Sequence, residues 1–162
     1  MTGETKKRVQ TFAFFILSAL AVGGGAAFLT RNNMDIYDEI NKPFLSPPGA
    51  VFPVVWTMLY VLMGISASLI WLKRYADKEK AENALLWYGA SLVVNFIWSP
   101  VFFNFRNFAA ALVILVLLLM LVLITINDYR RIFAPAAFLQ IPYVLWICFA
   151  GYLNFSIWLL NG

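Results

Sequence analysis

Five long stretches of the sequence contain no Lys, Arg, Asp or Glu, and they constrain the fold more than any other feature. They cover residues 9–30, 43–72, 83–105, 107–127 and 132–162, and each is at least 21 residues long. About 20 helical residues are enough to cross a hydrocarbon layer about 30 Å thick. We therefore predict an all-α membrane protein, a five-transmembrane-helix bundle that forms a single domain.

The alternative is a soluble protein with very apolar core helices. Hydrophobic residues make up 62% of the chain and charged residues only 12%, far from an ordinary soluble composition. A soluble helix would also carry a polar stripe along one face, and the segment AALVILVLLLMLVLITI at 110–126 has none. The hydropathy pattern therefore favours insertion into a lipid bilayer.

The connection between the first two spans is the longest in the chain. It covers residues 31–49 and contains Pro43, Pro47 and Pro48, whose fixed φ angles stiffen the backbone. Pro53 then falls within the first turn of the second span, where a missing N–H costs least. We expect an ordered lid that meets this helix at one angle. The predicted spans are about 8–29, 50–73, 82–103, 107–127 and 134–160.

The positive charges favour one side of the membrane. With five spans, the N-terminal tail and the second and fourth loops share a side, and together they hold nine of the twelve Lys and Arg residues. The other side holds Arg31, Lys42 and Arg106. The positive-inside rule then predicts a multi-pass protein with a cytoplasmic N-terminus, if it lies in a plasma membrane. Because this topology explains the net charge of +4, we expect no nucleic-acid partner.

Missing residue types exclude several kinds of chemistry. The chain has no histidine, which removes Ser-His and Cys-His nucleophiles and most zinc sites, so no metal or cofactor is expected. The spans carry no charged residues, which counts against a proton relay or ion-coupled transport. A single cysteine, Cys148, cannot form an intramolecular disulfide.

Three spans place aromatic residues on one helical face. Such faces fit either an interior aromatic pocket or ordinary packing, whereas tryptophans near span ends (Trp71, Trp87 and Trp158) are typical of interfacial belts. By helical spacing the faces are Trp56, Tyr60 and Gly64; Asn95, Trp98 and Phe102; and Pro142, Trp146, Phe149 and Leu153, with Asn154 beside the last.

A few residues within the spans have two readings each. Asn95 needs polar partners in hydrocarbon and would either bond to another helix or offer its amide to a ligand. Pro142 within the fifth span would bend the backbone, either for packing or to open a cavity. The small residues GGGAA at 23–27 form a candidate packing or dimer face.

Four segments resemble a known family. They are KPFLSPP (42–48), WTMLYVLMG (56–64), NFIWS (95–99) and PYVLWICFAGYLN (142–154). In this order they are similar to the signatures of the TspO/MBR family, which comprises bacterial tryptophan-rich sensory proteins and the mitochondrial translocator protein, or peripheral-type benzodiazepine receptor. The resemblance implies a bacterial cell membrane, a homodimer, and a pocket under the first loop that binds porphyrins such as protoporphyrin IX.

The resemblance also assigns residues. Trp56 and Tyr60 match the family's W-x-x-L-Y motif and Trp146 matches P-Y-x-x-W, while Asn95 and Tyr37 match an asparagine and a loop aromatic. The chain departs from the pattern where Leu45 and Ile36 replace loop tryptophans, which weakens stacking on a porphyrin. The candidate ligand-binding residues are Tyr37, Pro48, Trp56, Tyr60, Asn95, Trp98, Pro142, Trp146, Phe149 and Asn154.

The resulting hypothesis is a membrane protein that binds a porphyrin or another flat hydrophobic molecule and has a sensory, regulatory or transport role in tetrapyrrole handling. Its partners would be that ligand, the lipid bilayer and a second copy of the chain. One alternative is an enzyme that degrades porphyrin in light and oxygen, using Trp56 and Trp146. Another is a ligand-sensing regulator of a second membrane protein.

Overall fold

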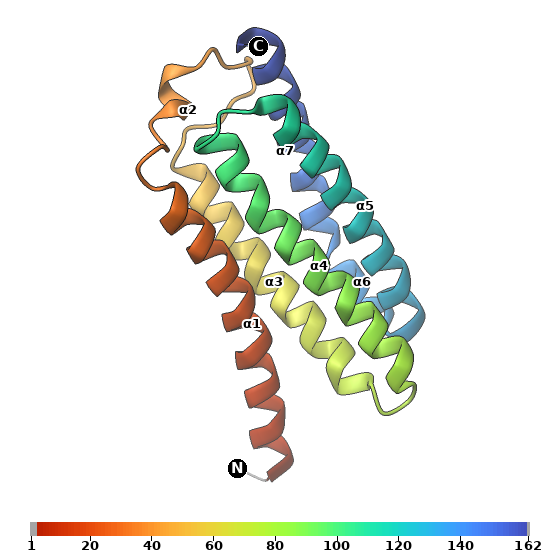
Figure 1. The fold of residues 1–162 in the computed structure, drawn as a ribbon. Helices are drawn as coiled ribbons and strands as arrows, with labels where there is room; N and C mark the ends of the chain where they lie inside the picture. Colours follow the sequence, from red (N-terminus) through yellow and green to blue (C-terminus); the bar gives the residue numbers. More distant parts are fainter. Residues whose placement is uncertain (1–2, 162) are drawn as a thin grey trace.

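A computed structural model of the chain describes residues 3–161, which are helical throughout apart from short connections (Figure 1). Five helical segments are long and apolar enough to cross a membrane, so the predicted all-α fold with five spans is confirmed. In chain order the helices are α1 (Gly3–Thr30), α2 (Ile36–Glu39), α3 (Val51–Lys73), α4 (Lys78–Phe103), α5 (Phe108–Ile132), α6 (Ala134–Phe138) and α7 (Ile141–Asn161).

Side-chain caps fix where two of the spans begin. The Asp77 carboxylate accepts a hydrogen bond from the Lys80 backbone N–H (3.1 Å), and the Asn107 side chain accepts one from the Ala110 N–H (3.0 Å). Each cap satisfies a donor that the first helical turn leaves free. Between α4 and α5, Arg106 adopts φ 52°, which makes the turn short and sets the two helices side by side.

The fifth span is two helices rather than the one expected over 134–160. Its backbone turns at 139–140, between α6 and α7, and Pro142 lies in the first turn of α7 instead of inside a continuous helix. Ser66 of α3 stabilises the break: its hydroxyl donates to the Ala136 carbonyl (2.7 Å) and accepts from the Gln140 side chain (3.2 Å). Backbone groups freed at a break can therefore be satisfied inside the bundle.

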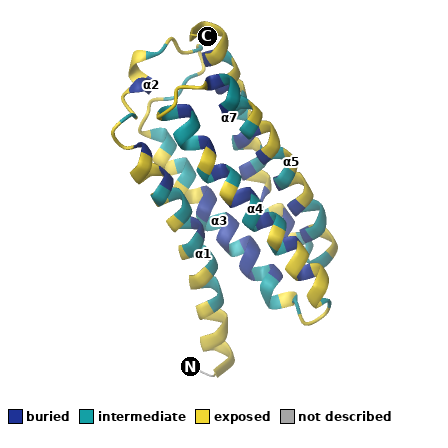
Figure 2. Ribbon diagram, viewed as in Figure 1, coloured by how far each residue is buried: buried dark blue, intermediate teal, exposed yellow. Residues whose placement is uncertain are grey.

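Two glycines allow α1 to lie close to α3. A Cβ atom on Gly64 would come within 2.5 Å of the Ile16 Cα, so a larger residue would push the two backbones apart. A Cβ atom on Gly23 would overlap the ring of Tyr60. Beyond these contacts the first turns of α1 diverge from the bundle and are exposed (Figures 1 and 2).

The connection over 31–50 caps one end of the bundle and is tied to it at both sides. Within the cap, the Tyr37 hydroxyl donates to the Pro47 carbonyl (3.0 Å). Asn161 at the end of α7 accepts from the Asn41 N–H and donates to the Asn41 carbonyl, both at 2.9 Å. On the other side the Asn33 side chain donates to that of Asn104 (2.9 Å).

The start of α1 and the end of α7 lie at opposite ends of the bundle (Figure 1). The connection between α3 and α4 is at the end where α1 begins, and the cap over 31–50 is at the end where α7 finishes. This separation is what an odd number of spans produces.

Candidate functional site

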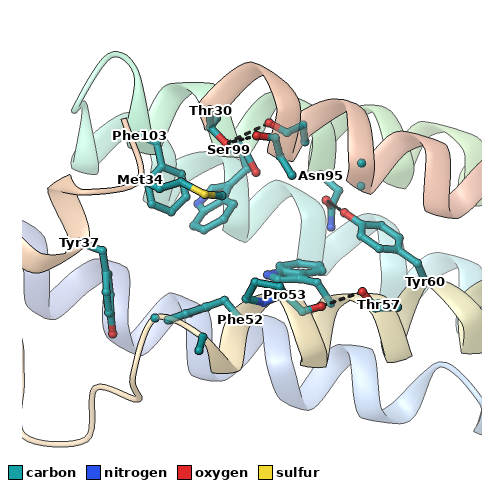
Figure 3. Close-up of a pocket in the computed structure, with 18 of the residues that line it drawn as sticks. Thr30, Met34, Tyr37, Phe52, Pro53, Thr57, Tyr60, Asn95, Ser99 and Phe103 are labelled. Carbon is teal, nitrogen blue, oxygen red and sulfur yellow. Dashed lines mark hydrogen bonds between the residues drawn. The ribbon is translucent and has the colours of Figure 1, made fainter. Parts of the chain in front are cut away.

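A cavity of about 570 Å³ lies beneath the cap (Figure 3). Its lining comes from α1, the cap, α3 and α4. The aromatic faces predicted lining residues on the second, third and fifth spans, but α7 of the fifth span contributes none and packs mainly against α5. The volume falls within the range of about 300–1,000 Å³ that small-molecule pockets occupy.

Aromatic rings of similar orientation form one side of the cavity. The Trp56 ring lies 5.6 Å from that of Tyr60, with 27° between their planes, and 6.5 Å from that of Trp98, with 35° between planes. All three residues line the cavity. Roughly parallel faces of this kind can stack on a flat aromatic guest, which prefers offset or parallel contact.

A chain of hydrogen bonds closes the inner end of the cavity. The Tyr60 hydroxyl donates to Asn95 Oδ1 (2.7 Å), and Asn95 Nδ2 donates to the Tyr143 hydroxyl oxygen (2.7 Å). Figure 3 shows the Tyr60 side chain reaching toward Asn95. The structure therefore gives Asn95 the interhelical role that was one of its two readings, linking α3, α4 and α7, and it also leaves Asn95 in the cavity lining.

The mouth of the cavity is acidic. Asp35 and Asp38 line it, and no Lys or Arg among residues 3–161 does so. Asp38 forms an ion pair with Lys42 (3.4 Å), whose ammonium also lies 4.6 Å from the centre of the Tyr37 ring. Asp35 makes no ion pair in this part of the chain. Burial raises the pKa of the Tyr37 phenol above its ordinary value.

Five of the ten candidate residues lie together in the cavity lining, and five lie elsewhere. Those in the lining are Tyr37, Trp56, Tyr60, Asn95 and Trp98. Those outside it are Pro48, Pro142, Trp146, Phe149 and Asn154.

Two of the residues outside the lining support it from behind. The Trp146 ring meets the Trp56 ring edge to face, with centroids 6.4 Å apart and planes at 89°. Asn154 accepts a hydrogen bond from the Trp98 indole (3.3 Å) and donates to the Phe108 carbonyl (2.7 Å). Both therefore fix the orientation of a lining tryptophan.

Sequence reasoning missed two groups of functional residues. Tyr143 lies in the segment PYVLWICFAGYLN but is not among the candidate residues, although it completes the hydrogen-bond chain with Asn95. The small residues of α1 also line the cavity, among them Gly23, Gly24 and Ala27. Their signal was the GGGAA segment, since side chains this small leave room for a guest as readily as for a helix.

The two loop residues that stand in place of tryptophans, Ile36 and Leu45, do not line the cavity. Ile36 is 2% exposed and packs into the core, while Leu45 is 59% exposed on the outside of the cap. Neither residue lines the cavity. The parallel rings that remain come from α3 and α4.

Five spans, a tied cap and an aromatic cavity define a multi-pass membrane protein with a pocket within its helical bundle. The sequence profile of the TspO/MBR family matches residues 14–159, and the chain belongs to this family. It is 35% identical to the tryptophan-rich protein TspO of Chlorobaculum tepidum over 96% of this chain and 98% of that one.

Two further relatives come from a second bacterium and from an animal. The tryptophan-rich sensory protein of Cereibacter sphaeroides is 38% identical, over 77% of this chain and 76% of that one. The translocator protein of Bos taurus is 31% identical, over 93% and 89%. The similarity therefore extends across most of each chain.

Proposed function

We propose that this protein binds a flat hydrophobic molecule, most specifically a porphyrin such as protoporphyrin IX, in the cavity beneath the cap. The observation that carries the proposal is the set of roughly parallel rings of Trp56, Tyr60 and Trp98 beside a cavity of about 570 Å³. Stacking on such rings contributes about 0.5–1.5 kcal/mol per contact beyond burial. Binding would serve sensing, regulation or transport of tetrapyrroles in a bacterial cell membrane.

The test is an absorbance titration of the purified protein with protoporphyrin IX. Gly24→Leu fills the cavity from α1, where an added Cβ meets no atom within 4 Å. We expect a loss of affinity of about tenfold or more, because a pocket discriminates by roughly that factor for small changes in bulk. Gly89→Leu is the matched control, since Gly89 is also helical, has equally open surroundings and lies outside this cavity. Equal affinity in Gly24→Leu and the control would contradict the site.

Tryptophan variants give a second measurement on the same site. Trp56→Ala removes a stacking face, and Trp146→Ala removes only the ring behind it, so Trp56→Ala should weaken binding more. Trp87→Ala, in α4 and outside the cavity, controls for the loss of one tryptophan. If all three variants bind alike, the parallel rings do not form the site.

A second candidate function is degradation of the bound porphyrin in light and oxygen. The contact of Trp56 with both Trp98 and Trp146 supports it, because an oxidisable indole in the cavity would lie within a cluster of three. Protoporphyrin IX illuminated in air should then bleach faster with the protein than without it, and Trp56→Phe should remove the difference. Equal bleaching with and without the protein would exclude degradation and leave binding as the proposed function.

The role in regulation and the homodimer are further parts of the proposal. The GGGAA segment is not free for a partner along its whole length, because Gly23 faces Tyr60 and Ala26 is buried. Within this segment only residues such as Gly24 and Ala27, which are exposed, would be open to a second copy of the chain. Co-purification from native membranes, with and without protoporphyrin IX, distinguishes a ligand-sensing partner of another membrane protein from an isolated binder.

A further inference from the structure

A second, separate groove lies at the opposite end of the bundle from the cap. The first turns of α1 diverge from α3 (Figure 1). Between the start of α1 and the end of α3 lies a groove of about 880 Å³. It shares no lining residue with the cavity beneath the cap. Its walls are the start of α1, the end of α3 and Phe133.

The lining is strongly positive. Lys7, Arg8, Lys73 and Arg74 all contribute to it, against one carboxylate, Glu4. Glu4 is already paired with Arg8 at 3.0 Å. Among residues 3–161, the other three cations make no ion pair. Three positive charges on two facing helices therefore lack an anion.

Arg74 is fixed over the groove rather than extended into water. Its guanidinium donates to the Trp71 carbonyl (2.6 Å) and the Tyr75 hydroxyl (2.8 Å). The same group lies 4.1 Å from the centre of the Trp71 ring and 4.4 Å from that of Tyr75. Long cations at the ends of spans usually extend freely toward solvent. This one has little side-chain entropy left to lose on binding an anion.

Toward the middle of the membrane the groove becomes apolar. Phe14 is 67% exposed, and Phe15 contacts the Trp71 ring with centroids 6.2 Å apart. Leu69 of α3 continues the opposite wall. One groove thus joins a cationic end at the level of the lipid headgroups to an apolar wall at the level of the acyl chains.

We propose that this groove binds one anionic phospholipid from the adjacent leaflet. Its phosphate would lie between Lys7 of α1 and the Lys73–Arg74 pair at the end of α3, and an acyl chain would lie along Phe14 and Leu69. The charge complementarity selects an anionic headgroup, as basic pockets between transmembrane helices do. The apolar wall selects a lipid over a free phosphate, because only a lipid can cover it.

The test is native mass spectrometry of the full chain with dioleoylphosphatidylglycerol or dioleoylphosphatidylcholine. We expect one phosphatidylglycerol to be retained in preference to phosphatidylcholine. The triple variant Lys7→Gln/Lys73→Gln/Arg74→Gln should weaken retention of phosphatidylglycerol by more than about tenfold, since it removes the three unpaired cations that attract the anionic headgroup. The matched control is Lys6→Gln/Arg130→Gln/Arg131→Gln, which removes the same charge from the same end but not from the groove.

Each remaining outcome overturns the proposal. Equal retention of both lipids by the unmodified protein would mean that the groove does not select charge. An equal loss in the control variant would mean that the general charge of this end is responsible. A rise in melting temperature with inorganic phosphate that matches the rise with phosphatidylglycerol would indicate an anion site rather than a lipid site. Far-ultraviolet circular dichroism checks that every variant remains helical.

Discussion

Asn95 shows how a polar side chain is accommodated in the middle of an apolar bundle. Its amide accepts from Tyr60 and donates to Tyr143, so both polar ends are satisfied by tyrosines from neighbouring helices. In hydrocarbon an unsatisfied polar group is costly, and a half-satisfied network is worse than none. The sequence indicated that Asn95 needs partners, but spacing alone could not name them.

Removing one hydroxyl from this network should destabilise the fold. Tyr60→Phe leaves Asn95 Oδ1 without its donor and should cost about 0.5–2 kcal/mol, within the range measured for such bonds. Tyr129→Phe is the control, because the buried Tyr129 hydroxyl has no hydrogen-bond partner in the part of the chain that the structure describes. Thermal unfolding in detergent should show a lower melting temperature for Tyr60→Phe only. A comparable drop in the control would mean that the lost bond is not the cause.

The acidic mouth should affect which porphyrins bind well. Protoporphyrin IX carries two carboxylates, and within residues 3–161 Asp35 at the mouth makes no ion pair that would offset repulsion. Asp35→Asn should tighten binding of protoporphyrin IX by roughly two- to fivefold at low salt, as expected for a partly screened charge several ångströms away. The dimethyl ester of protoporphyrin IX, which is neutral, should bind Asp35→Asn and the parent protein equally.

The titrations of Asp35→Asn and the parent protein should be repeated at low and high ionic strength. Asp128→Asn, at the other end of the bundle, is the control. Screening should reduce the difference between Asp35→Asn and the parent. A gain in affinity that is the same for the ester and the diacid would argue against an electrostatic cause.

At the scale of an element, the cap consists of the short helix α2 and an irregular segment. Hydrogen bonds at its two sides hold it on the bundle. The prolines predicted its stiffness, and Pro53 does lie in the first turn of α3. The contacts that hold it, from Asn161 and Asn104, come from residues 120 and 71 positions away. No local pattern in the sequence encodes such pairings, so the anchoring could be learned only from the structure.

Releasing one anchor should speed ligand exchange. Asn161→Ala removes the two hydrogen bonds to Asn41 and should raise the dissociation rate of protoporphyrin IX by about two- to tenfold, because exposed hydrogen bonds contribute at the low end of about 0.5–1.5 kcal/mol each. The equilibrium helical content should not change. Asn83→Ala, exposed on α4 at the other end, is the control for stopped-flow measurements. Unchanged release in Asn161→Ala would mean that the cap does not limit exchange.

For the whole molecule, five apolar stretches were sufficient to predict the number of spans, because nothing but helices satisfies the backbone of a lone segment in lipid. The break between α6 and α7 was not predictable in the same way. It depends on Ser66, far away in α3, which accepts from Gln140 and donates to Ala136. Likewise, helical periodicity placed Trp146 on a face with Phe149 but could not show that Trp146 packs against the Trp56 ring outside the cavity lining.

The charge asymmetry of the whole chain predicts its orientation. In a Cys148→Ser background, Leu45→Cys in the cap and Ala76→Cys between α3 and α4 place one thiol at each end of the bundle. A membrane-impermeant maleimide should label Leu45→Cys in intact cells and Ala76→Cys only after permeabilisation, because nine of the twelve basic residues lie on the side of Ala76. The reverse labelling pattern would exclude a cytoplasmic N-terminus.

The exposed part of the cavity lining lies mostly on α1 and α3, where Gly24, Ala27, Pro53 and Thr57 are all open to the surroundings. At that depth the surroundings are the bilayer. A hydrophobic guest would therefore equilibrate first between water and lipid and only then between lipid and protein. Apparent dissociation constants should consequently rise in proportion to the amount of lipid in the assay, and comparisons between laboratories become meaningful only after correction for partitioning.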